Sequence, residues 1–183
     1  MYQDLKQSHV TREQRGRSAV VVQLWWLVQS TLFGLSPQFM FSWRRFLLRL
    51  FGAKVGKSVL IRPTARITYP WKVSIGDYSW VGDNTVLYSL GPITIGNNVV
   101  ISQNSYICTG THDYQVPSFD LVTKPIVIED ESWIATDVFV APGITIGKGA
   151  VISARSMVTR DIEPLAICRG LPAKMIRYRE MKS

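Results

Sequence analysis

The sequence predicts an all-β fold, a parallel β-helix, from three observations. An aliphatic residue returns every six positions from Val55 onward, and a small side chain usually follows it four positions later. A single long insertion after Ile107 interrupts the pattern. A period of six suits a chain that coils around an axis with three short strands per turn, because equivalent side chains then stack inside the coil.

The repeat is complete at its aliphatic positions. Ile, Leu or Val stands at 55, 61, 67, 75, 81, 87, 95, 101, 107, 128, 134, 140, 146, 152 and 158. The small residues are Val59, Ala65, Ser79, Thr85, Gly91, Val99, Ser105, Thr111, Ser132, Val138, Ala150 and Ser156, with Trp71, Ile144 and Ile162 as exceptions. These positions predict about five coils, which form a β-helix domain over residues 55–162.

The spacing also locates the corners of the coil. The steps from 67 to 75 and from 87 to 95 are eight residues long, and each contains a proline, Pro70 or Pro92. A glycine follows several aliphatic positions, where a corner can require a conformation that a Cβ atom hinders. These glycines are Gly56, Gly76, Gly82, Gly96 and Gly147.

One step is far longer than the others. From Ile107 to Ile128 the chain takes twenty-one residues, so residues 108–125 must leave the coil as a loop. A loop on a rigid scaffold often carries function. This loop contains His112, one of only two histidines in the chain.

The composition suits one folded domain with a modest extension, since 46% of the 183 residues are hydrophobic. Lys and Arg number 21 against 13 acidic residues, and the net charge of +8 favours anionic partners such as phosphates or acidic lipid surfaces. No dense basic run or nucleic-acid-binding motif is present, so no nucleic-acid partner is expected. Cys108 and Cys168 match no metal or redox spacing, which indicates a reducing compartment and a cytoplasmic location.

Residues 1–54 are expected to form an N-terminal helical extension. The uncharged run over residues 18–43 is long enough to be considered as a membrane span, but polar residues interrupt it and basic residues flank both ends. No small-x-small site follows, which argues against a cleaved signal peptide. Ser36 and Pro37 suggest the N-cap and first position of a second helix that ends near residue 51.

The second helix has a narrow polar stripe on an apolar surface. Gln38, Ser42, Arg45 and Arg49 share the stripe at helical spacing. Two roles remain open for residues 19–51. They can cover the open end of the β-helix, or they can lie in a membrane interface with the arginines near lipid phosphates.

The C-terminal residues 163–183 break the six-residue register. They end in alternating apolar and basic residues. A terminal cap and tail that leave the coil are expected there.

Several stretches carry a family resemblance. The repeats, the stretch IGDYSWVGDNTV and the ending SWIATDVFVAPGITIGKGAVISARSMVTRDI with RGLPAKMIR resemble the hexapeptide-repeat, left-handed β-helix acyltransferases. Within that family the chain is most similar to the colanic acid biosynthesis acetyltransferases, through QLWWLVQSTLF, SPQ, LLRLFGAKVG, ITYPW and CTGTHDY. The resemblance covers nearly the whole chain, including the N-terminal helices.

The resemblance implies features that the spacing does not show. It implies a left-handed coil, although parallel crossovers are generally right-handed. It also implies a homotrimer in which acetyl-CoA lies in the groove between two subunits, with the loop histidine facing the thioester. No metal is required.

His112 is the expected general base of such an enzyme. Transfer of an acetyl group to a sugar hydroxyl requires removal of the alcohol proton, and an imidazole with an ordinary pKa near ~6.5 is suited to this at neutral pH. Asp113 is a candidate for orienting the ring, or it only solvates the loop. His9, in the polar N-terminal segment, is expected to be a solvated surface residue.

Other site residues follow from the resemblance position by position. Asn84 matches a residue that faces the acceptor, although a corner residue is the plain alternative. Trp133, Ala135 and Ala154 match positions along the pantetheine arm, where a backbone N–H can stabilise an oxyanion. Thr159, Arg160, Lys174 and Arg177 match the region that meets the adenosine phosphates, and solvated charge is the alternative for the last two. Arg155 departs from the small residue that is usual at its position.

The predicted function is acetyl-CoA-dependent O-acetylation of a sugar hydroxyl in exopolysaccharide biosynthesis of the colanic-acid type. The alternatives are another small acceptor, such as a free sugar, serine or an antibiotic, and a non-catalytic β-helix scaffold. A gamma-type carbonic anhydrase shares the fold, but it needs three histidines for zinc, and only His112 lies in the repeats. The acceptor sugar, and whether it is free, nucleotide-linked or lipid-linked, is not encoded in any recognisable motif.

Overall fold

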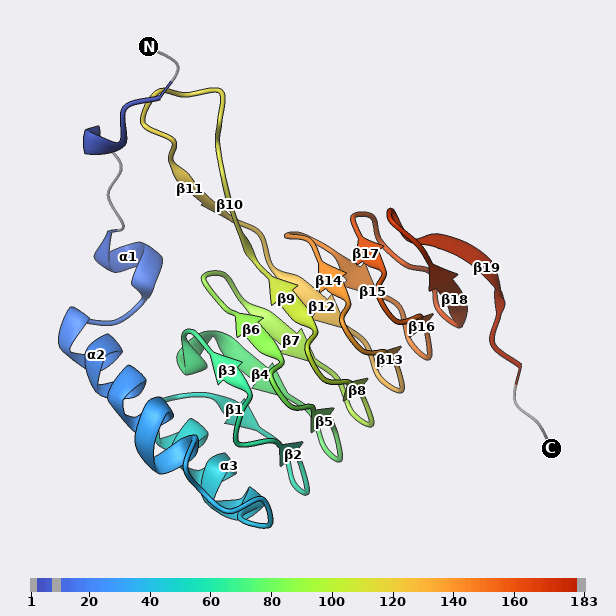
Figure 1. The fold of residues 1–183 in the computed structure, drawn as a ribbon, viewed down its shortest axis with the longest axis horizontal. Coiled ribbons are helices and arrows are strands. Elements are labelled where there is room, and N and C mark those ends of the chain that lie inside the picture. The colour runs from blue at the N-terminus through green and yellow to red at the C-terminus, as the bar shows by residue number, and fades with distance from the viewer. Residues whose placement is uncertain (1–2, 8–10, 181–183) are drawn as a thin grey trace.

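The computed structural model describes residues 3–7 and 11–180, so the expectation for His9 lies outside the described residues. The chain coils into a parallel β-helix with helices at its N-terminal end and a hairpin that projects from its side (Figure 1). The predicted fold class is confirmed.

Three parallel sheets form the walls of the coil, and each coil contributes one strand to each sheet. Sheet A contains β1 (Lys54–Val55), β4 (Val73–Ile75), β7 (Ile93–Ile95), β12 (Ile126–Ile128) and β15 (Thr145–Ile146). Sheet B contains β2 (Leu60–Ile61), β5 (Trp80–Val81), β8 (Val100–Ile101), β13 (Trp133–Ile134) and β16 (Val151–Ile152). Sheet C contains β3 (Arg66–Ile67), β6 (Val86–Tyr88), β9 (Tyr106–Cys108), β14 (Phe139–Val140) and β17 (Met157–Val158).

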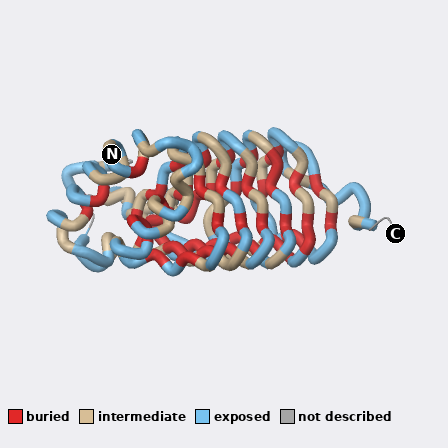
Figure 2. Tube along the Cα trace, turned by 90° about the horizontal axis from the view of Figure 1, so that it is seen from below, coloured by how far each residue is buried: buried red, intermediate tan, exposed pale blue. Residues whose placement is uncertain are grey.

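The six-residue period places its aliphatic side chains in the core. All fifteen repeat positions from Val55 to Val158 are buried, and successive coils stack them in register, as in the pairs Ile75 with Ile95 and Val81 with Ile101. Figure 2 shows the buried positions recurring along each coil. The stacked aliphatic rows therefore form the continuous core that the sequence predicts.

The corner glycines are needed for close approach and not for an unusual dihedral angle. A Cβ atom on Gly76 would lie 2.6 Å from the carbonyl carbon of Gly96, and one on Gly82 would lie 2.6 Å from the nitrogen of Gln103. Positive φ angles fall instead on the turn residues two positions later, such as Tyr78 (φ 60°). The glycines therefore let neighbouring coils stack, which differs from the conformational reason expected from the sequence.

The coil continues further than the sequence repeat. Ile162 forms a parallel bridge with Ile146, and β18 (Ala166–Arg169) pairs in parallel with β16. β19 (Lys174–Tyr178) then turns back antiparallel to β18. A partial sixth coil thus follows the five predicted ones, and the prediction missed it because its steps are no longer six residues.

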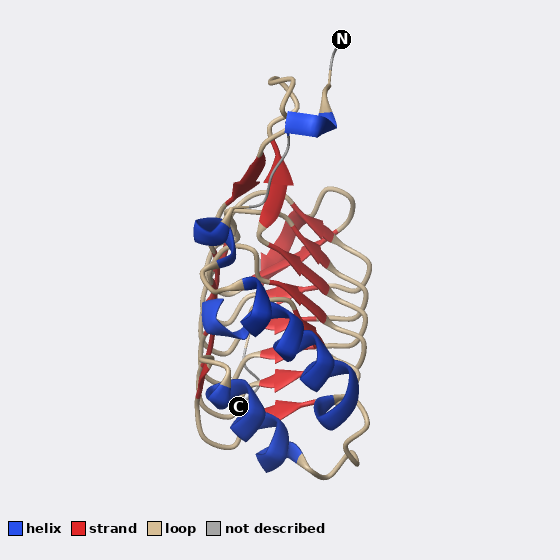
Figure 3. Cartoon of the chain, turned by 90° about the vertical axis from the view of Figure 1, so that its left-hand side faces the viewer, coloured by secondary structure: helices blue, strands red, loops and turns tan. Residues whose placement is uncertain are grey.

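The N-terminal helices lie across the first coil (Figure 3). The elements are η1 (Leu5–Gln7), α1 (Arg12–Arg15), α2 (Ala19–Val28), the π-helical turn η2 (Gln29–Phe33) and α3 (Phe41–Leu50), and a short 3-10 helix η3 (Pro70–Lys72) lies in the first long corner. The N-cap prediction at Ser36 is wrong, because α3 begins at Phe41 without a side-chain cap. The Ser36 hydroxyl instead donates to the Phe33 carbonyl, which closes the preceding helix.

The arginines of α3 point toward the β-helix. Arg45 donates to the Val59 carbonyl at 2.9 Å, and Arg49 donates to the Val55 and Gly56 carbonyls at 2.7–2.9 Å. Arg44 is fully buried and donates to the Ile61 carbonyl at 2.6 Å. The guanidinium groups therefore satisfy carbonyls at the otherwise open end of the coil, which is the first of the two roles considered for residues 19–51.

Helix α2 and the first residue of η2 complete the same edge on sheet C. The Trp25 indole N–H donates to the Ile67 carbonyl at 2.7 Å, and the Gln29 side chain accepts from the Ile67 N–H at 2.6 Å. Within the described ranges, no helix is long and apolar enough to span a bilayer.

The outward rows of the three sheets differ in polarity. The row on sheet A is mostly polar, with Lys54, Ser74, Thr94, Val127 and Thr145. The row on sheet B is apolar, with Leu60, Trp80, Val100, Trp133, Val151 and Ile167. The row on sheet C is apolar apart from its first member, with Arg66, Val86, Tyr106, Phe139 and Met157.

Candidate active site

The long insertion forms a hairpin at the corner between sheets C and A. β10 (Gly110–His112) pairs antiparallel with β11 (Leu121–Thr123), and His112 lies opposite Leu121. Thr111, one of the small residues of the repeat, is exposed on β10, while Thr109 is buried and its hydroxyl donates to the Tyr88 carbonyl at 2.7 Å. The chain thus leaves the core immediately after Thr109.

The ring of His112 is held by Phe119. Its Nδ1 lies 2.8 Å from the Phe119 carbonyl oxygen, and the two rings stack with centroids 4.3 Å apart and planes 9° apart. Phe119 has a positive φ of 49°, which turns its carbonyl toward the imidazole. A carbonyl only accepts, so this bond places the proton of the neutral ring on Nδ1 and leaves the lone pair of the exposed ring on Nε2.

Asp113 does not perform the orienting role considered for it. Its carboxylate accepts from the Gln115 N–H at 2.9 Å, and its own N–H donates to the Asp120 carbonyl. The carboxylate therefore shapes the turn of the hairpin, and Phe119 is the orienting residue. No sequence signal identifies Phe119, because the bond comes from its backbone.

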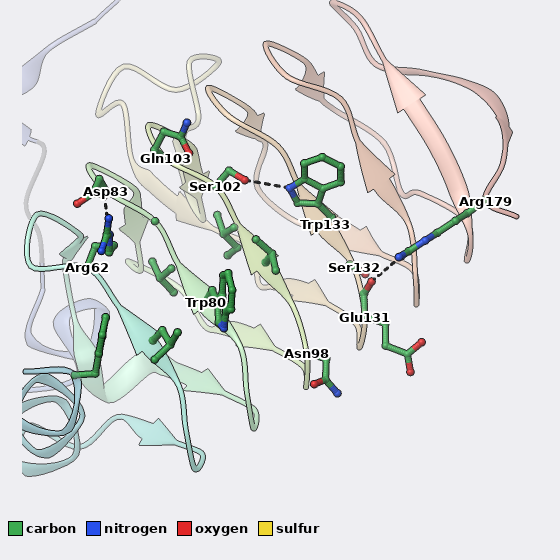
Figure 4. A pocket seen from close by; sticks show the side chains of 16 residues that line it. Arg62, Trp80, Asp83, Asn98, Ser102, Gln103, Glu131, Ser132, Trp133 and Arg179 are labelled. Atoms are coloured by element: carbon green, nitrogen blue, oxygen red, sulfur yellow. Dashed lines mark hydrogen bonds and ion pairs between the residues drawn. The ribbon is translucent and has the colours of Figure 1, made fainter. Parts of the chain in front are cut away.

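An open groove of about 740 Å³ runs along sheet B (Figure 4). Trp80 and Trp133 stand in its apolar row, two strands apart with Val100 between them. Both indoles are about half exposed, at 52% and 47%. The Trp133 N–H donates to the Ser102 hydroxyl at 3.0 Å, which fixes one indole against the groove.

Charged side chains close both ends of this groove. At one end Arg62 pairs with Asp83 at 2.8 Å. Burial acts to raise the pKa of Asp83, but hydrogen bonds from Arg62 and Thr64 outweigh it and hold the pKa below its usual value. At the other end Arg179 donates to the Glu131 and Gly149 carbonyls at 3.1–3.3 Å. An apolar floor between the Arg62–Asp83 pair at one end and Arg179 at the other suits a ligand with both polar and apolar faces.

Trp133 also borders a second groove, which follows the corner between sheets B and C. Ala135 and Ala154 line its first part, and Ala154, Arg155 and Lys174 line its continuation toward the C-terminal strand. Arg155 is exposed in this groove and pairs with Asp137 at 3.4 Å. Four of the predicted cofactor residues, Trp133, Ala135, Ala154 and Lys174, thus lie along one continuous surface.

The remaining predicted residues lie elsewhere. Asn84 occupies the same corner with a φ of 54°, but it lines a separate cavity beside Gln29 and Arg66. Thr159 and Arg160 follow β17 on the corner between sheets C and A, the same corner as His112. Arg177 is exposed on β19 and borders neither groove. One chain therefore does not bring His112 to Trp133.

Trp80 is a candidate ligand contact that was not predicted from the sequence. The residue immediately before each inward aliphatic of sheet B points outward, so the repeat itself places Trp80 in the row of Trp133. This signal was available in the spacing. The partners Ser102 and Arg179 carry no comparable signal, because their roles depend on contacts between coils.

Thiol and metal chemistry have little support at this site. Cys108 at the base of the hairpin is buried, and burial raises the pKa of its thiol. Across residues 3–7 and 11–180, no three His, Cys, Asp or Glu side chains cluster closely enough to hold a metal ion.

Comparison with known proteins identifies the family of this chain. The family model described as the hexapeptide repeat of succinyl-transferase matches residues 72–108 and 125–160. A relative from Escherichia coli strain K12, named as the colanic acid biosynthesis acetyltransferase WcaF, is 56% identical over 97% of both chains. The chain belongs to the hexapeptide-repeat acetyltransferases.

Two solved acetyltransferase structures superpose over most of this acetyltransferase. A maltose O-acetyltransferase of Clostridium difficile 630 has a TM-score of 0.81 and 28% identity, covering 90% of both chains. An acetyltransferase of Vibrio cholerae O1 biovar eltor, complexed with acetyl coenzyme A, has a TM-score of 0.81 and 27% identity, covering 97% and 96% of the two chains.

One backbone donor considered for this acetyltransferase is already engaged. The Ala135 N–H donates to the Ile152 carbonyl at 2.9 Å in the sheet B ladder, so it is not free to stabilise an oxyanion. The Trp133 N–H likewise donates to the Ala150 carbonyl at 2.8 Å. Of the three positions considered, Ala154 in the corner therefore remains the candidate donor.

Proposed function

We propose that this chain transfers the acetyl group of acetyl-CoA to a hydroxyl of a sugar in exopolysaccharide biosynthesis. The observation that carries the proposal is the Nδ1 contact of His112 with the Phe119 carbonyl, since it leaves Nε2 as an exposed base. The relative named for colanic acid biosynthesis and the maltose O-acetyltransferase support a sugar acceptor. The complex of the Vibrio cholerae relative supports acetyl-CoA as the donor.

In the proposed reaction, His112 Nε2 takes the proton of the sugar hydroxyl while that oxygen attacks the thioester carbonyl. The carbon–sulfur bond breaks as the tetrahedral intermediate collapses, and the imidazolium returns its proton to the leaving thiolate. The Phe119 carbonyl stabilises the ring as it becomes positively charged, because it accepts from Nδ1–H throughout. Asp113 supports this arrangement only through the hairpin turn.

The two grooves suit the two substrates. Lys174 and Arg155 lie at the end of the corner groove where the CoA phosphates would be held, and Ala135 and Ala154 leave width for the pantetheine arm. Of the other cofactor candidates, Thr159 and Arg160 must act from a neighbouring chain, and Arg177 lies just beyond the groove. The sheet B groove, with Trp80 as an exposed ring, is the proposed acceptor site. Asn84 lines a separate cavity, so it is not assigned to the acceptor site of its own chain.

The site requires a neighbouring chain, and a homotrimer supplies it. If sheet C of each coil faces a three-fold axis, the B–C corner of one chain meets the C–A corner of the next. His112 then lies over the grooves of its neighbour. The apolar row of sheet C, where Tyr106 and Phe139 stack 6.1 Å apart, suits burial at such an axis, whereas the polar row of sheet A suits solvent.

An acetyl transfer assay tests the proposed function. The protein is mixed with acetyl-CoA and with free, nucleotide-linked or lipid-linked sugars, and free thiol and acetylated product are measured. We expect thiol release that depends on a sugar and a product heavier by one acetyl group. The variant Trp133→Arg, which fills the groove, should bind less acetyl-CoA. Thiol release with serine or an antibiotic alone would favour those acceptors, and binding without transfer would favour a scaffold.

We also propose that the helical end of the molecule docks on an anionic membrane surface, at the inner face of the cytoplasmic membrane beside a lipid-linked acceptor. Large apolar side chains are exposed there on α2, η2 and α3 and in the turn between η2 and α3: Val20, Leu24, Trp26, Leu27, Leu32, Leu35, Phe39, Phe46 and Leu50. Residues 14–76 contain no Asp or Glu, and Arg17, Lys54 and Arg66 in this segment are exposed. An apolar face in a segment without carboxylates suits anionic lipid better than a typical protein partner.

Flotation with vesicles tests this docking. The parent chain should float with vesicles that contain phosphatidylglycerol, and less with phosphatidylcholine alone. The double variant Leu35→Glu with Phe39→Glu, at positions 80% and 79% exposed, should lose most of this binding. The matched control Leu165→Glu with Met175→Glu changes exposed apolar residues outside the helices and should float like the parent. Equal recovery of all three proteins in the unbound fraction would exclude docking on a membrane.

A further inference from the structure

The N-terminal segment runs beside the hairpin that carries His112, although the two are about a hundred residues apart in sequence (Figure 1). The Asp4 N–H donates to the Pro117 carbonyl at the hairpin tip at 2.7 Å. Further along, the Gln14 side-chain Nε2 donates to the Leu121 carbonyl at 3.3 Å. The hairpin is therefore contacted at its tip and along its second strand.

The Gln14 contact is made to Leu121 of β11, the residue directly opposite His112. Because the Asp113 N–H donates to Asp120, the next pair, His112 with Leu121, is a non-hydrogen-bonded pair. The Leu121 carbonyl therefore points away from β10. Gln14 supplies the donor that this exposed edge lacks.

Gln14 is itself held in place by a helix cap. Its Oε1 accepts from the Thr11 N–H at 2.8 Å, and its N–H donates to the Thr11 hydroxyl at 3.2 Å. These two bonds form a capping box around α1. The Gln14 side-chain amide is thus held at the start of α1 through Oε1 and bonds to the hairpin through Nε2.

The segment is anchored on the β-helix by η3. The Trp71 indole N–H donates to the Arg15 carbonyl at 2.7 Å. The Lys72 ammonium donates to the Gln14 carbonyl and to the Leu90 carbonyl. Burial lowers the pKa of Lys72, which is consistent with an ammonium enclosed between the segment and the coil.

Apolar packing continues the same connection. Val22 of α2, Tyr69 and Leu90 form a small buried cluster, and Leu121 and Trp71 pack against it. This cluster lies apart from the main core of the coil. Leu121 therefore joins the hairpin to the N-terminal region by its side chain as well as by its carbonyl.

We propose that residues 11–17 form a clamp that positions the His112 hairpin, with Gln14 as its positioning residue. The clamp holds the Leu121 carbonyl, and through β11 it sets where His112 and its partner Phe119 lie relative to the neighbouring chain's grooves. This inference rests on the proposed function for its catalytic consequence. Its structural part concerns only the hairpin and needs no substrate.

The test is Gln14→Glu, which keeps the acceptor for the Thr11 N–H and removes the donor to Leu121, because a carboxylate only accepts. We expect the amides of the hairpin to exchange with deuterium about fivefold to tenfold faster, the factor that one neutral hydrogen bond represents. We expect kcat for acetyl transfer to fall by a similar factor, with KM for acetyl-CoA within about twofold of the parent.

The matched control is Glu13→Gln, an exposed neighbour on the same helical turn, which should behave like the parent in both measurements. If Gln14→Glu does not fold, Gln14→Met removes the same donor without adding charge. Parent-like exchange and kcat in the variant would overturn the clamp. A fall in kcat accompanied by loss of the whole thermal transition would also overturn it, in favour of general stability. If the parent transfers no acetyl group, the proposed function fails, and the exchange measurement still decides the clamp.

Discussion

The variant His112→Ala is expected to lower kcat for acetyl transfer by two or more orders of magnitude. General base catalysis supplies roughly 10²–10⁴ in rate, and His112 is the one histidine among the described residues. KM for acetyl-CoA should change little, because Nε2 acts on the acceptor proton and His112 does not line the corner groove proposed for the cofactor. Steady-state kinetics with saturating acceptor measure both quantities.

Tyr114→Ala is the control for this variant, since Tyr114 lies in the same hairpin and is 78% exposed. It should retain parent turnover. If His112→Ala kept turnover within about threefold of the parent, the base assignment would be wrong.

The same variant also tests whether two chains share a site. In a trimer that pairs His112 of one chain with Trp133 of the next, mixing His112→Ala chains with Trp133→Arg chains leaves about a quarter of the interfaces intact. Activity should therefore return to about a quarter of the parent value after the mixture is unfolded and refolded together. Each variant refolded alone should stay inactive. A monomer in light scattering at micromolar concentration would contradict the arrangement.

The second large effect is expected on stability, from Arg44→Met. Arg44 is completely buried, and its guanidinium donates to the Ile61, Pro37 and Gln38 carbonyls and to the Ser36 hydroxyl at 2.6–2.9 Å. Burial, with Arg62 nearby, lowers the pKa of Arg44. Methionine fills similar space but leaves these buried acceptors without donors, and each unsatisfied group costs about 1–3 kcal/mol.

We therefore expect Arg44→Met to lower the free energy of unfolding by about 3 kcal/mol or more, measured as a shift of the urea midpoint at fixed protein concentration. Arg66→Met is the control, because Arg66 is exposed on β3. It should shift the midpoint little. A parent-like midpoint for Arg44→Met would show that the helical cap does not depend on this residue.

Arg44, Arg45 and Arg49 also show where sequence reasoning stops. Helical spacing places Arg45 and Arg49 on one stripe, and the stripe is present. Spacing does not say whether a stripe meets lipid, solvent or the end of a coil. The answer depends on the carbonyls of Val55, Val59 and Ile61, which are available only because no coil precedes the first one.

The sequence by itself determined the coil. Side chains alternate along a strand with a period of two, and the coil repeats every six residues, so the position of each Ile, Leu or Val in the repeat predicts that it is buried. The twenty-one-residue step in the same way predicts the hairpin. The family motifs added His112 as the candidate base and the residues around Trp133 as candidate cofactor contacts. The same period also places Trp80 in the outward row of sheet B that contains Trp133.

Only the tertiary structure decided how the site is held. The Phe119 carbonyl that orients His112, the Leu121 carbonyl that Gln14 binds and the engaged N–H of Ala135 are backbone groups, and a backbone group has the same chemistry in every residue. Their roles depend on which groups the fold leaves unpaired. The separation of His112 from Trp133 on different faces of the coil likewise depends on the sheets' arrangement in space, and it is the reason that the proposed site requires a second chain.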